Sequence, residues 1–334
     1  MATVDHNDTV SSLDQDVVVR NESESRFMQL INEKEMEEEV EIEEVVDDES
    51  VHIIGRLYLG SIDAARNLTG IETITHQSVR FNVEEYTKQQ MTRTIIELED
   101  SKDGDLLRRI PGILATLETI IVKAERDETN VLVHCIAGRS RSVSVVAAYM
   151  LVSAPKQKSV QDVVDQIRII RPWVEINAHF MQDLHLFHAV LGSTNEAKLS
   201  AEKAALLTAR SFPRLDFSAN LVDKILQGTK TITMRLLSDI DDDHDSDLRD
   251  IFPYAVVTAT TSSTCTDMLQ TRRQFAYLRI DQIEIRELSA MDQTILHKSS
   301  FDSSEELLAV LKQFYPHVTS ASLLLVMHFH TLYP

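Results

Sequence analysis

The chain has 334 residues, enough for about two average domains, and 43% of them are hydrophobic, so it can bury real cores. Its formal net charge of −20 argues against a general nucleic-acid coat or a binder of anionic membranes, because both depend on clustered lysine and arginine. Two cysteines indicate no disulfide framework, and there is neither a signal peptide nor an apolar run that would span a bilayer, so we expect a soluble protein of the cytoplasm and/or nucleus, with no membrane partner.

The first 50 residues carry most of the negative charge. They hold 17 acidic residues against three basic ones, Arg20, Arg26 and Lys34. Such a segment repels itself and has little apolar surface to bury, so we expect a disordered acidic tail. A helix over 26–39, and a docking or autoinhibitory arm, stay open as alternatives.

Order is expected to begin at Val51 with short strands. The predicted strands are 51–54, 57–60, 91–99 and 130–134. The last of them is a short, mostly apolar run, typical of a buried parallel strand. Before it, apolar residues at helical spacing predict a helix over 110–124, with Pro111 tolerated in its first turn.

Helices are expected after residue 134. The segment 142–152 is apolar on nearly every side and should be central. Ser159 begins a second helix, with Asp162 placed to complete its cap, and Arg171-Pro172 ends it.

A third helix, 177–191, is predicted to lead through a linker at 192–195 into a connecting helix over 196–210. From about Phe212 the character changes to a small, mostly β domain. Its predicted elements are a helix over 217–228, strands over 229–236, 254–261, 275–288 and 323–332, and a helix over 303–314.

The segment His134-Cys135-Ile136-Ala137-Gly138-Arg139-Ser140-Arg141-Ser142 lies between a predicted strand and a predicted helix. Consecutive N–H groups of such a turn, together with the helix N-terminus, can hold a phosphate dianion. Gly138 permits a backbone conformation that other residues resist, and Arg141 supplies a planar fork for two phosphate oxygens.

This setting favours the thiolate form of Cys135, which is the nucleophilic form. Ser142 can donate a hydrogen bond to that sulfur, while His134 is expected to order the loop. We therefore predict Cys135, Arg141 and Ser142 as catalytic residues. The predicted substrate-binding residues are Ile136, Ala137, Gly138, Arg139, Ser140 and Arg141.

This nine-residue segment resembles the active-site motif of the dual-specificity phosphatases, in the protein tyrosine phosphatase superfamily. The resemblance runs from about Val51 to Leu191 and departs from the family at 71–93. It is also supported by Leu57-Tyr58-Leu59-Gly60-Ser61, which resembles the family's opening strand and turn, and by Arg171-Pro172, Asn177 and Phe180, which resemble its closing helices. It implies a phosphocysteine mechanism without metal or other cofactor, and a shallow pocket for phosphotyrosine and phosphoserine/threonine.

A carboxylic acid is needed to protonate the leaving oxygen, and the candidates are Asp100 and Asp103. We prefer Asp100 because it directly follows an apolar strand and keeps the next helix in register. The few extra residues that this choice places between the acid and Cys135 then fall in the polar turn 125–130, and a surface turn is easily lengthened. Asp103 as the acid, and Asp100 as a mere helix cap, stay open.

Arg139 adds a positive charge at the rim of the loop. It either pairs with a local carboxylate or favours more highly charged substrates, such as inositol phospholipids or RNA 5′ phosphates. Relatives of the family that act on such substrates also carry basic loops.

In the second domain, 217–235 resembles the ASCH domain, a small PUA-like β-barrel, through a helix ending in Gly228 and Lys-Thr-x-Thr-x-Arg on a strand. The resemblance implies an RNA or nucleoside ligand at Lys230, Thr233 and Arg235. Lys230 and Thr233 match two residues of amidohydrolases in that family. Ser299 or Ser300 stands where their glutamate belongs, so hydrolase activity is not expected.

Other residues of this domain bear on the predicted ligand site. The acidic stretch 239–247 would repel a nucleic-acid backbone, and an ordinary polar strand face is the alternative to a ligand site. His328 and His330 alternate on one strand, and we expect no metal role for them.

The expected fold class is α/β, with a central mostly parallel sheet flanked by helices, plus a small PUA-like β-barrel. The expected organisation is an acidic disordered tail (1–50), a phosphatase domain (51–192), a linker helix (193–211) and an ASCH-like domain (212–334). The expected function is a dual-specificity protein phosphatase acting on phosphorylated proteins. The rival from another class is a phospho- or RNA-binding adaptor with weak catalysis.

Overall fold

The computed structural model describes residues 49–67, 71–76, 92–153, 158–238, 247–262 and 272–333. Asp47–Pro334 fall into one compact unit. The predictions for the acidic tail, for most of the stretch 239–247 and for Cys265 lie outside the described residues. Within the described ranges, no helix combines the length and the apolar character needed to cross a bilayer.

The first sheet has the strand order β1-β2-β5-β3-β4, and the predicted mostly parallel arrangement is confirmed. β1 (Val51–Ile54) pairs antiparallel with β2 (Leu57–Gly60), while β5 (Asn130–His134) lies parallel to both β2 and β3 (Ile71–His76). β4 (Thr92–Ile96) completes the parallel part as an edge strand. The side chains of Val131 to His134 in β5 are buried, and the carboxyl end of this strand is where an α/β sheet places its ligand.

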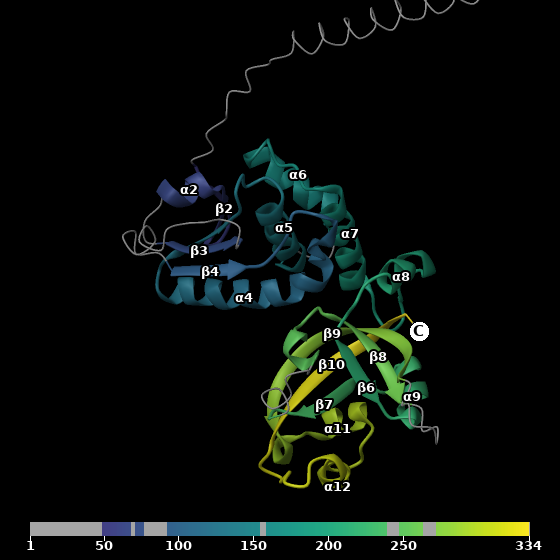
Figure 1. Ribbon diagram of the computed structural model, residues 1–334. Helices are drawn as coiled ribbons and strands as arrows, with labels where there is room; N and C mark the ends of the chain where they lie inside the picture. Colours follow the sequence, from purple (N-terminus) through teal and green to yellow (C-terminus); the bar gives the residue numbers. More distant parts are fainter. Residues whose placement is uncertain are drawn as a thin grey trace, which may run out of the picture. The chain divides into compact units, whose positions relative to one another are not determined.

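Helices pack against this sheet and against one another through their apolar faces. α4 (Leu106–Arg126) runs alongside β3 and β4 in Figure 1 and contacts both α5 (Arg141–Ser153) and α7 (Ala178–Gly192). α6 (Val160–Ile170) packs on α5 and α7, and the short α2 (Ile62–Asn67) packs on β2 and β5. The predicted cap at Ser159 is confirmed as a capping box with Asp162.

The predicted start of α4 was one turn too late. The helix begins at Leu106, after the one-turn η1 (Lys102–Gly104), so Pro111 lies inside it rather than in its first turn. Leu106 and Leu107 are buried, and the Leu107 N–H donates to the carboxylate of Asp183 on α7 (3.0 Å). A distant side chain thus satisfies the helix's early N–H group, which the local pattern does not reveal.

The connecting helix is shorter than predicted. α8 spans only Ala201–Thr208 and is capped by Ser200. Residues before it cannot join the helix because the Leu199 N–H donates to Leu332 O (3.0 Å), a contact with a strand far along the chain.

The second sheet has the order β6-β8-β9-β10-β7 and forms a half-barrel. Its strands are β6 (Arg214–Phe217), β7 (Ile232–Leu236), β8 (Val256–Ser262), β9 (Arg272–Glu287) and β10 (Leu323–Tyr333). The edge strands β6 and β7 are linked by a side chain, because Arg235 donates from Nη2 to Asp216 O (2.8 Å). Figure 1 shows the long β9 and β10 curling together.

The helices of this region only partly match the prediction. The expected helix 217–228 is confirmed only in part: Phe217 is the last residue of β6, η2 (Ala219–Leu221) follows, and the α-helix is confined to the short α9 (Val222–Leu226). α12 (Ser304–Phe314) is confirmed with its Ser303 cap. The remaining elements are η3 (Asp247–Asp250), η4 (Leu288–Ala290) and α11 (Gln293–Ser299).

Candidate active site

The loop between β5 and α5 has all of its carbonyl oxygens engaged. Each C=O from Cys135 to Ser140 accepts a hydrogen bond from a group beside or behind the loop. The donors are, in chain order, His134 Nδ1 (3.2 Å), Ile62 N (2.9 Å), Arg171 Nη2 (3.4 Å), Arg171 Nε (2.9 Å), Glu175 N (3.1 Å) and Ser144 N (2.8 Å).

This pattern fixes where the amides of the loop point. In a planar trans peptide, the C=O of one residue and the N–H of the next point in opposite directions. The described chain has no cis peptide bond, so carbonyls turned outward leave the N–H groups of residues 136–141 turned inward. A ring of inward N–H groups at the start of α5 is an anion-binding site.

A buried guanidinium supports this loop from behind. Arg171 is fully buried, reaches the carbonyls of Ala137 and Gly138, and lies 5.2 Å from the ring centroid of Trp173. Burial lowers the pKa of Arg171 to about 10, so it remains charged at neutral pH. A positive charge therefore lies directly behind the anion-binding turn.

Cys135 lies at the base of the loop. Its side chain is buried, while Ile136, Ala137 and Arg139 after it are exposed. The Ser142 hydroxyl is 3.3 Å from Cys135 Sγ, within hydrogen-bonding distance of the sulfur. The predicted nucleophile and its predicted partner are thus brought together at the first turn of α5.

Asp100 is brought to the same loop. The Ser140 hydroxyl donates to Asp100 Oδ1 (2.8 Å), and Asn177 Nδ2 donates to the same oxygen. Arg141 Nε lies 3.6 Å from the other oxygen, Oδ2. Asn177 also caps α7 through the Phe180 N–H (2.8 Å), so the carboxylate is tied both to the loop and to a helix end.

Asp103 and Arg139 lie at the surface of the same region. Asp103 is exposed in η1, and the cap residue of α4 is Asp105 rather than Asp100. Arg139 takes the pairing alternative: its guanidinium contacts Glu175 (2.7 Å) and the Trp173 carbonyl (3.1 Å). This pair is solvent-exposed, so it orders the rim while contributing little stability.

His134 is buried beneath the loop. Burial is the main reason that its pKa is lowered from 6.5 to about 4, although the bond to the Cys135 carbonyl acts in the opposite direction. The neutral ring therefore holds the loop backbone, as expected of a loop-ordering residue.

Because the folded pKa of His134 is the lower one, its unfolded form takes up a proton first. Between pH 6.5 and 4, we expect wild type to lose about 1.4 kcal/mol of stability per pH unit relative to His134→Asn. Urea unfolding of both proteins across this range measures the difference. Parallel stability curves would contradict the burial of a neutral imidazole.

The sequence of this site is similar to that of known proteins. Residues 57–189 match the model of the dual specificity phosphatase catalytic domain. The protein 123R of Invertebrate iridescent virus 6, which carries the name of a tyrosine phosphatase, is 33% identical over 152 residues, 44% of this chain and 97% of that protein. The chain belongs to the dual-specificity phosphatase family. It is therefore a cysteine-based phosphatase.

The chain is also similar to a second curated protein and to a solved structure. Dual specificity protein phosphatase 22-B of Danio rerio is 29% identical over 137 residues, 40% of this phosphatase and 72% of that protein. The crystal structure of the human tyrosine phosphatase-like serine/threonine/tyrosine-interacting protein covers 43% of this chain and 98% of that one, with 20% identity and a TM-score of 0.36.

Two residues of the phosphatase site were not predicted as site residues. Arg171 was interpreted as a helix stop and Asn177 as the start of a helix, and both supported the family resemblance, but neither was given a role in the site. No local pattern marks a buried arginine as a loop support, whereas an asparagine cap close to an active-site helix carries some signal.

In the half-barrel, the three predicted ligand residues lie on or beside β7. Lys230 is buried and donates to the carbonyls of Ile232 (2.8 Å) and Ser299 (2.6 Å). Burial, and then the charges of Arg235 and Lys224, lower its pKa to about 7. Thr233 is also buried and accepts from Arg235 Nη1 (2.9 Å).

The two histidines of β10 have partners that their spacing did not reveal. His328 Nε2 lies 2.7 Å from Glu284, and His330 Nδ1 lies 3.0 Å from Asp281, both on the adjacent β9. His330 also contacts Ser193 through Nε2 (3.1 Å). In the part of the chain that the structure describes, no group of three or more His, Cys, Asp or Glu side chains is arranged to hold a metal.

Proposed function

We propose that this phosphatase removes phosphate from tyrosine and from serine or threonine in proteins through a phosphocysteine intermediate. The observation that carries the proposal is the turning outward of six successive carbonyls above Cys135, which leaves a ring of amides for phosphoryl oxygens. Arg141 completes this ring by binding two of those oxygens.

In the first step, Cys135 Sγ attacks phosphorus as a thiolate, the S–P bond forms and the ester P–O bond breaks. Asp100 gives its proton to the departing oxygen. Because Asp100 Oδ1 receives two hydrogen bonds, Oδ2, on the side of Arg141, is the oxygen that carries this proton.

In the second step, a water molecule attacks phosphorus and gives a proton to Asp100, while the S–P bond breaks and phosphate leaves. The Ser142 hydroxyl, 3.3 Å from the sulfur, donates to the thiolate as it re-forms.

A phosphorylated protein is the substrate class that the names of the relatives support. The alternative is an inositol phospholipid or an RNA 5′ phosphate, which a free basic rim would favour. Arg139 argues against that alternative, because its guanidinium is taken up by Glu175 and by the Trp173 carbonyl.

One panel assay tests the function. Phosphotyrosine and phosphothreonine peptides, an inositol phospholipid and triphosphorylated RNA are compared on one preparation. Both peptides should be hydrolysed faster than the lipid and the RNA. Faster turnover of either of the latter would overturn the substrate class. Peptide binding without turnover would favour the adaptor.

For the half-barrel we propose an ASCH-like domain, over about 212–334, that binds RNA or a nucleoside at Lys230, Thr233 and Arg235. The favouring observation is a buried lysine beside a buried threonine on β7. Ser299 or Ser300 stands where the acid of the related hydrolases belongs, and Lys230 donates to the Ser299 carbonyl, so we expect the site to bind rather than to hydrolyse. We expect wild type to bind RNA or a nucleoside, and Lys230→Ala to fold but lose this binding. Lys312→Ala, which replaces an exposed lysine, should keep it.

The proposed cellular location is the cytoplasm and/or nucleus, because both keep a catalytic thiol reduced. Imaging of the tagged chain tests it.

A further inference from the structure

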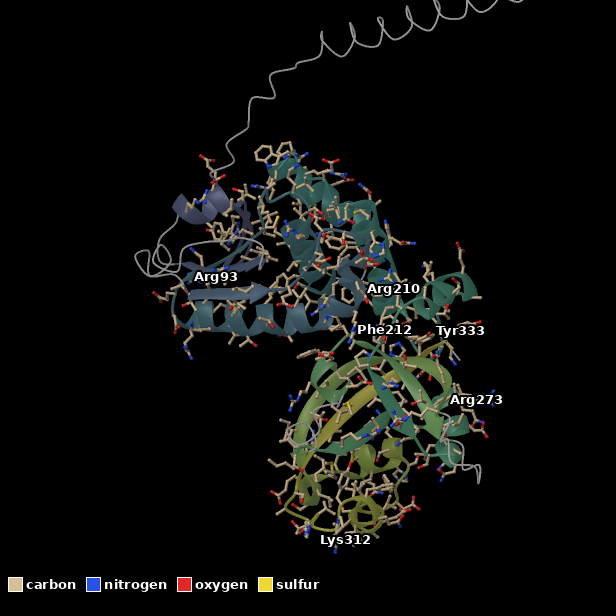
Figure 2. The ribbon with its side chains drawn as sticks, in the orientation of Figure 1. Arg93, Arg210, Phe212, Arg273, Lys312 and Tyr333 are labelled. Carbon is tan, nitrogen blue, oxygen red and sulfur yellow. The ribbon has the colours of Figure 1, made fainter. Side chains whose placement is uncertain are left out.

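Arg210 contacts the segment that carries Asp100. It lies just after α8, in the linker outside the residues that match the family model (Figure 2). Its guanidinium donates from Nη2 to Asp183 on α7 and from Nη1 to Asp105, 3.0 Å away. One side chain from the linker thus joins α7 to the residue that caps α4.

The contact with Asp183 is a strong anchor. Asp183 is fully buried, and its other oxygen accepts the Leu107 N–H of α4. Burial by itself would lower the pKa of Arg210, but the hydrogen bonds and charges of Asp183 and Asp105 raise it above its ordinary value. Two residues on, Phe212 belongs to the same buried apolar cluster as Leu106.

The chain between Asp105 and Asp100 is short and compact. The Ser101 hydroxyl accepts the Asp103 N–H (3.2 Å), and the Ser101 carbonyl accepts the Gly104 N–H (3.2 Å). A Cβ on Gly104 would collide with the Glu99 carbonyl, so the turn is closed on itself. Asp105 ends it in the left-handed conformation, with φ of 35°.

A shift of Asp105 is therefore transmitted to Asp100 through the four residues of a tight turn between them. Ser140 and Asn177 hold Asp100 itself, while Arg210 holds the far end of the turn. Loss of the Arg210 contact frees that end, and a general acid displaced by about 1 Å loses much of its rate contribution.

We propose that Arg210 is a positioning residue for the general-acid turn, through which the linker sets the efficiency of leaving-group protonation. The role of Arg210 rests on the proposed role of Asp100. It means that the linker affects catalysis from outside the catalytic domain, because the residues that match the family model do not include Arg210.

The test uses two substrates that differ in their need for an acid. Phenyl phosphate releases a phenol with a pKa of about 10, like that of tyrosine, and so requires protonation. 4-Nitrophenyl phosphate releases a phenolate that leaves readily without a proton. The full-length chain is assayed as wild type, Asp100→Asn, Arg210→Ala and the double variant. Arg214→Ala removes an exposed ion pair with Asp247 and is the matched control.

Asp100→Asn should lower kcat on phenyl phosphate about 100-fold, with a much smaller loss on 4-nitrophenyl phosphate. Arg210→Ala should show the same selectivity with about a 10-fold loss, and no further loss when added to Asp100→Asn. Arg214→Ala should behave as wild type. Equal losses of Asp100→Asn on both substrates would reject Asp100 as the acid. Given a selective Asp100→Asn, equal or absent losses in Arg210→Ala overturn the role of Arg210.

A second variant decides the matter if Arg210→Ala does not fold. Asp105→Gly removes only the carboxylate at the turn, keeps the left-handed backbone and leaves Asp183 paired. Glu128→Gly, at another left-handed position with φ of 54°, controls for the glycine itself. A selective loss in Asp105→Gly with a normal Glu128→Gly supports the role of Arg210. An unselective or absent loss overturns it.

Discussion

Replacement of Cys135 by serine is expected to lower kcat/KM for a phosphotyrosine peptide by at least about 10⁴-fold. A serine hydroxyl stays protonated at neutral pH, so the attacking anion is lost. The amides of the loop and Arg141 remain, because the carbonyls of residues 135–140 keep their donors. Initial rates, together with peptide affinity by calorimetry, measure the two effects separately, and affinity should be nearly unchanged.

The chain supplies a matched control in its other cysteine. Cys265→Ser should retain wild-type rates, since the proposed mechanism uses a single thiol. Rapid quenching with a labelled substrate should trap a phosphoenzyme in wild type and in Cys265→Ser, but none in Cys135→Ser. A phosphoenzyme that persists in Cys135→Ser would place the covalent step on another residue.

The parts of the site that could be predicted are contiguous in sequence. Cys135, Ser142 and Arg141 are held by one strand, one turn and one helix, and the apolar run 130–134 and the helix after it each identify themselves locally. The motif therefore predicts its own geometry. A register argument favoured Asp100 over Asp103, and the structure brings Asp100 beside Ser140 and Arg141.

The parts that could not be predicted depend on side chains that come from distant elements. Arg171 meets the loop from 33 residues away, and Arg210 meets Asp105 from 105 residues away. Burial of an arginine is decided by what folds over it, and no periodicity in a single sequence reports that. The early start of α4 has the same origin, since Asp183 satisfies an N–H group of its first turn.

In the half-barrel, a strand signal was overlooked. Arg214 to Phe217 alternate polar and apolar residues, and β6 buries Leu215 and Phe217 while it exposes Arg214 and Asp216. That period of two predicts a strand. The predicted helix 217–228 began at Phe217, the last residue of β6, although Phe217 pairs with Thr261 of β8.

Replacement of Gly138 by alanine should have the second large effect. Gly138 has φ of +64°, which costs an L-residue about 1–2 kcal/mol. An added Cβ would also collide with Arg171 Nη2 and would lie 2.6 Å from the Gly60 carbonyl oxygen. Because overpacking a rigid site costs about 1–3 kcal/mol more, we expect a total loss of about 2–5 kcal/mol in the free energy of unfolding.

The same variant should lose at least about 100-fold in kcat/KM, because Arg171 and the carbonyls that it holds must move. Gly55→Ala separates the two causes: Gly55 has φ of +55°, yet nothing lies within 4 Å of an added Cβ. It should cost only the backbone term, about 1–2 kcal/mol, and leave catalysis intact. If urea unfolding and kinetics find the two variants alike, crowding by Arg171 does not shape the loop. A large difference means that the anion site depends on a close fit between a glycine backbone and one buried guanidinium.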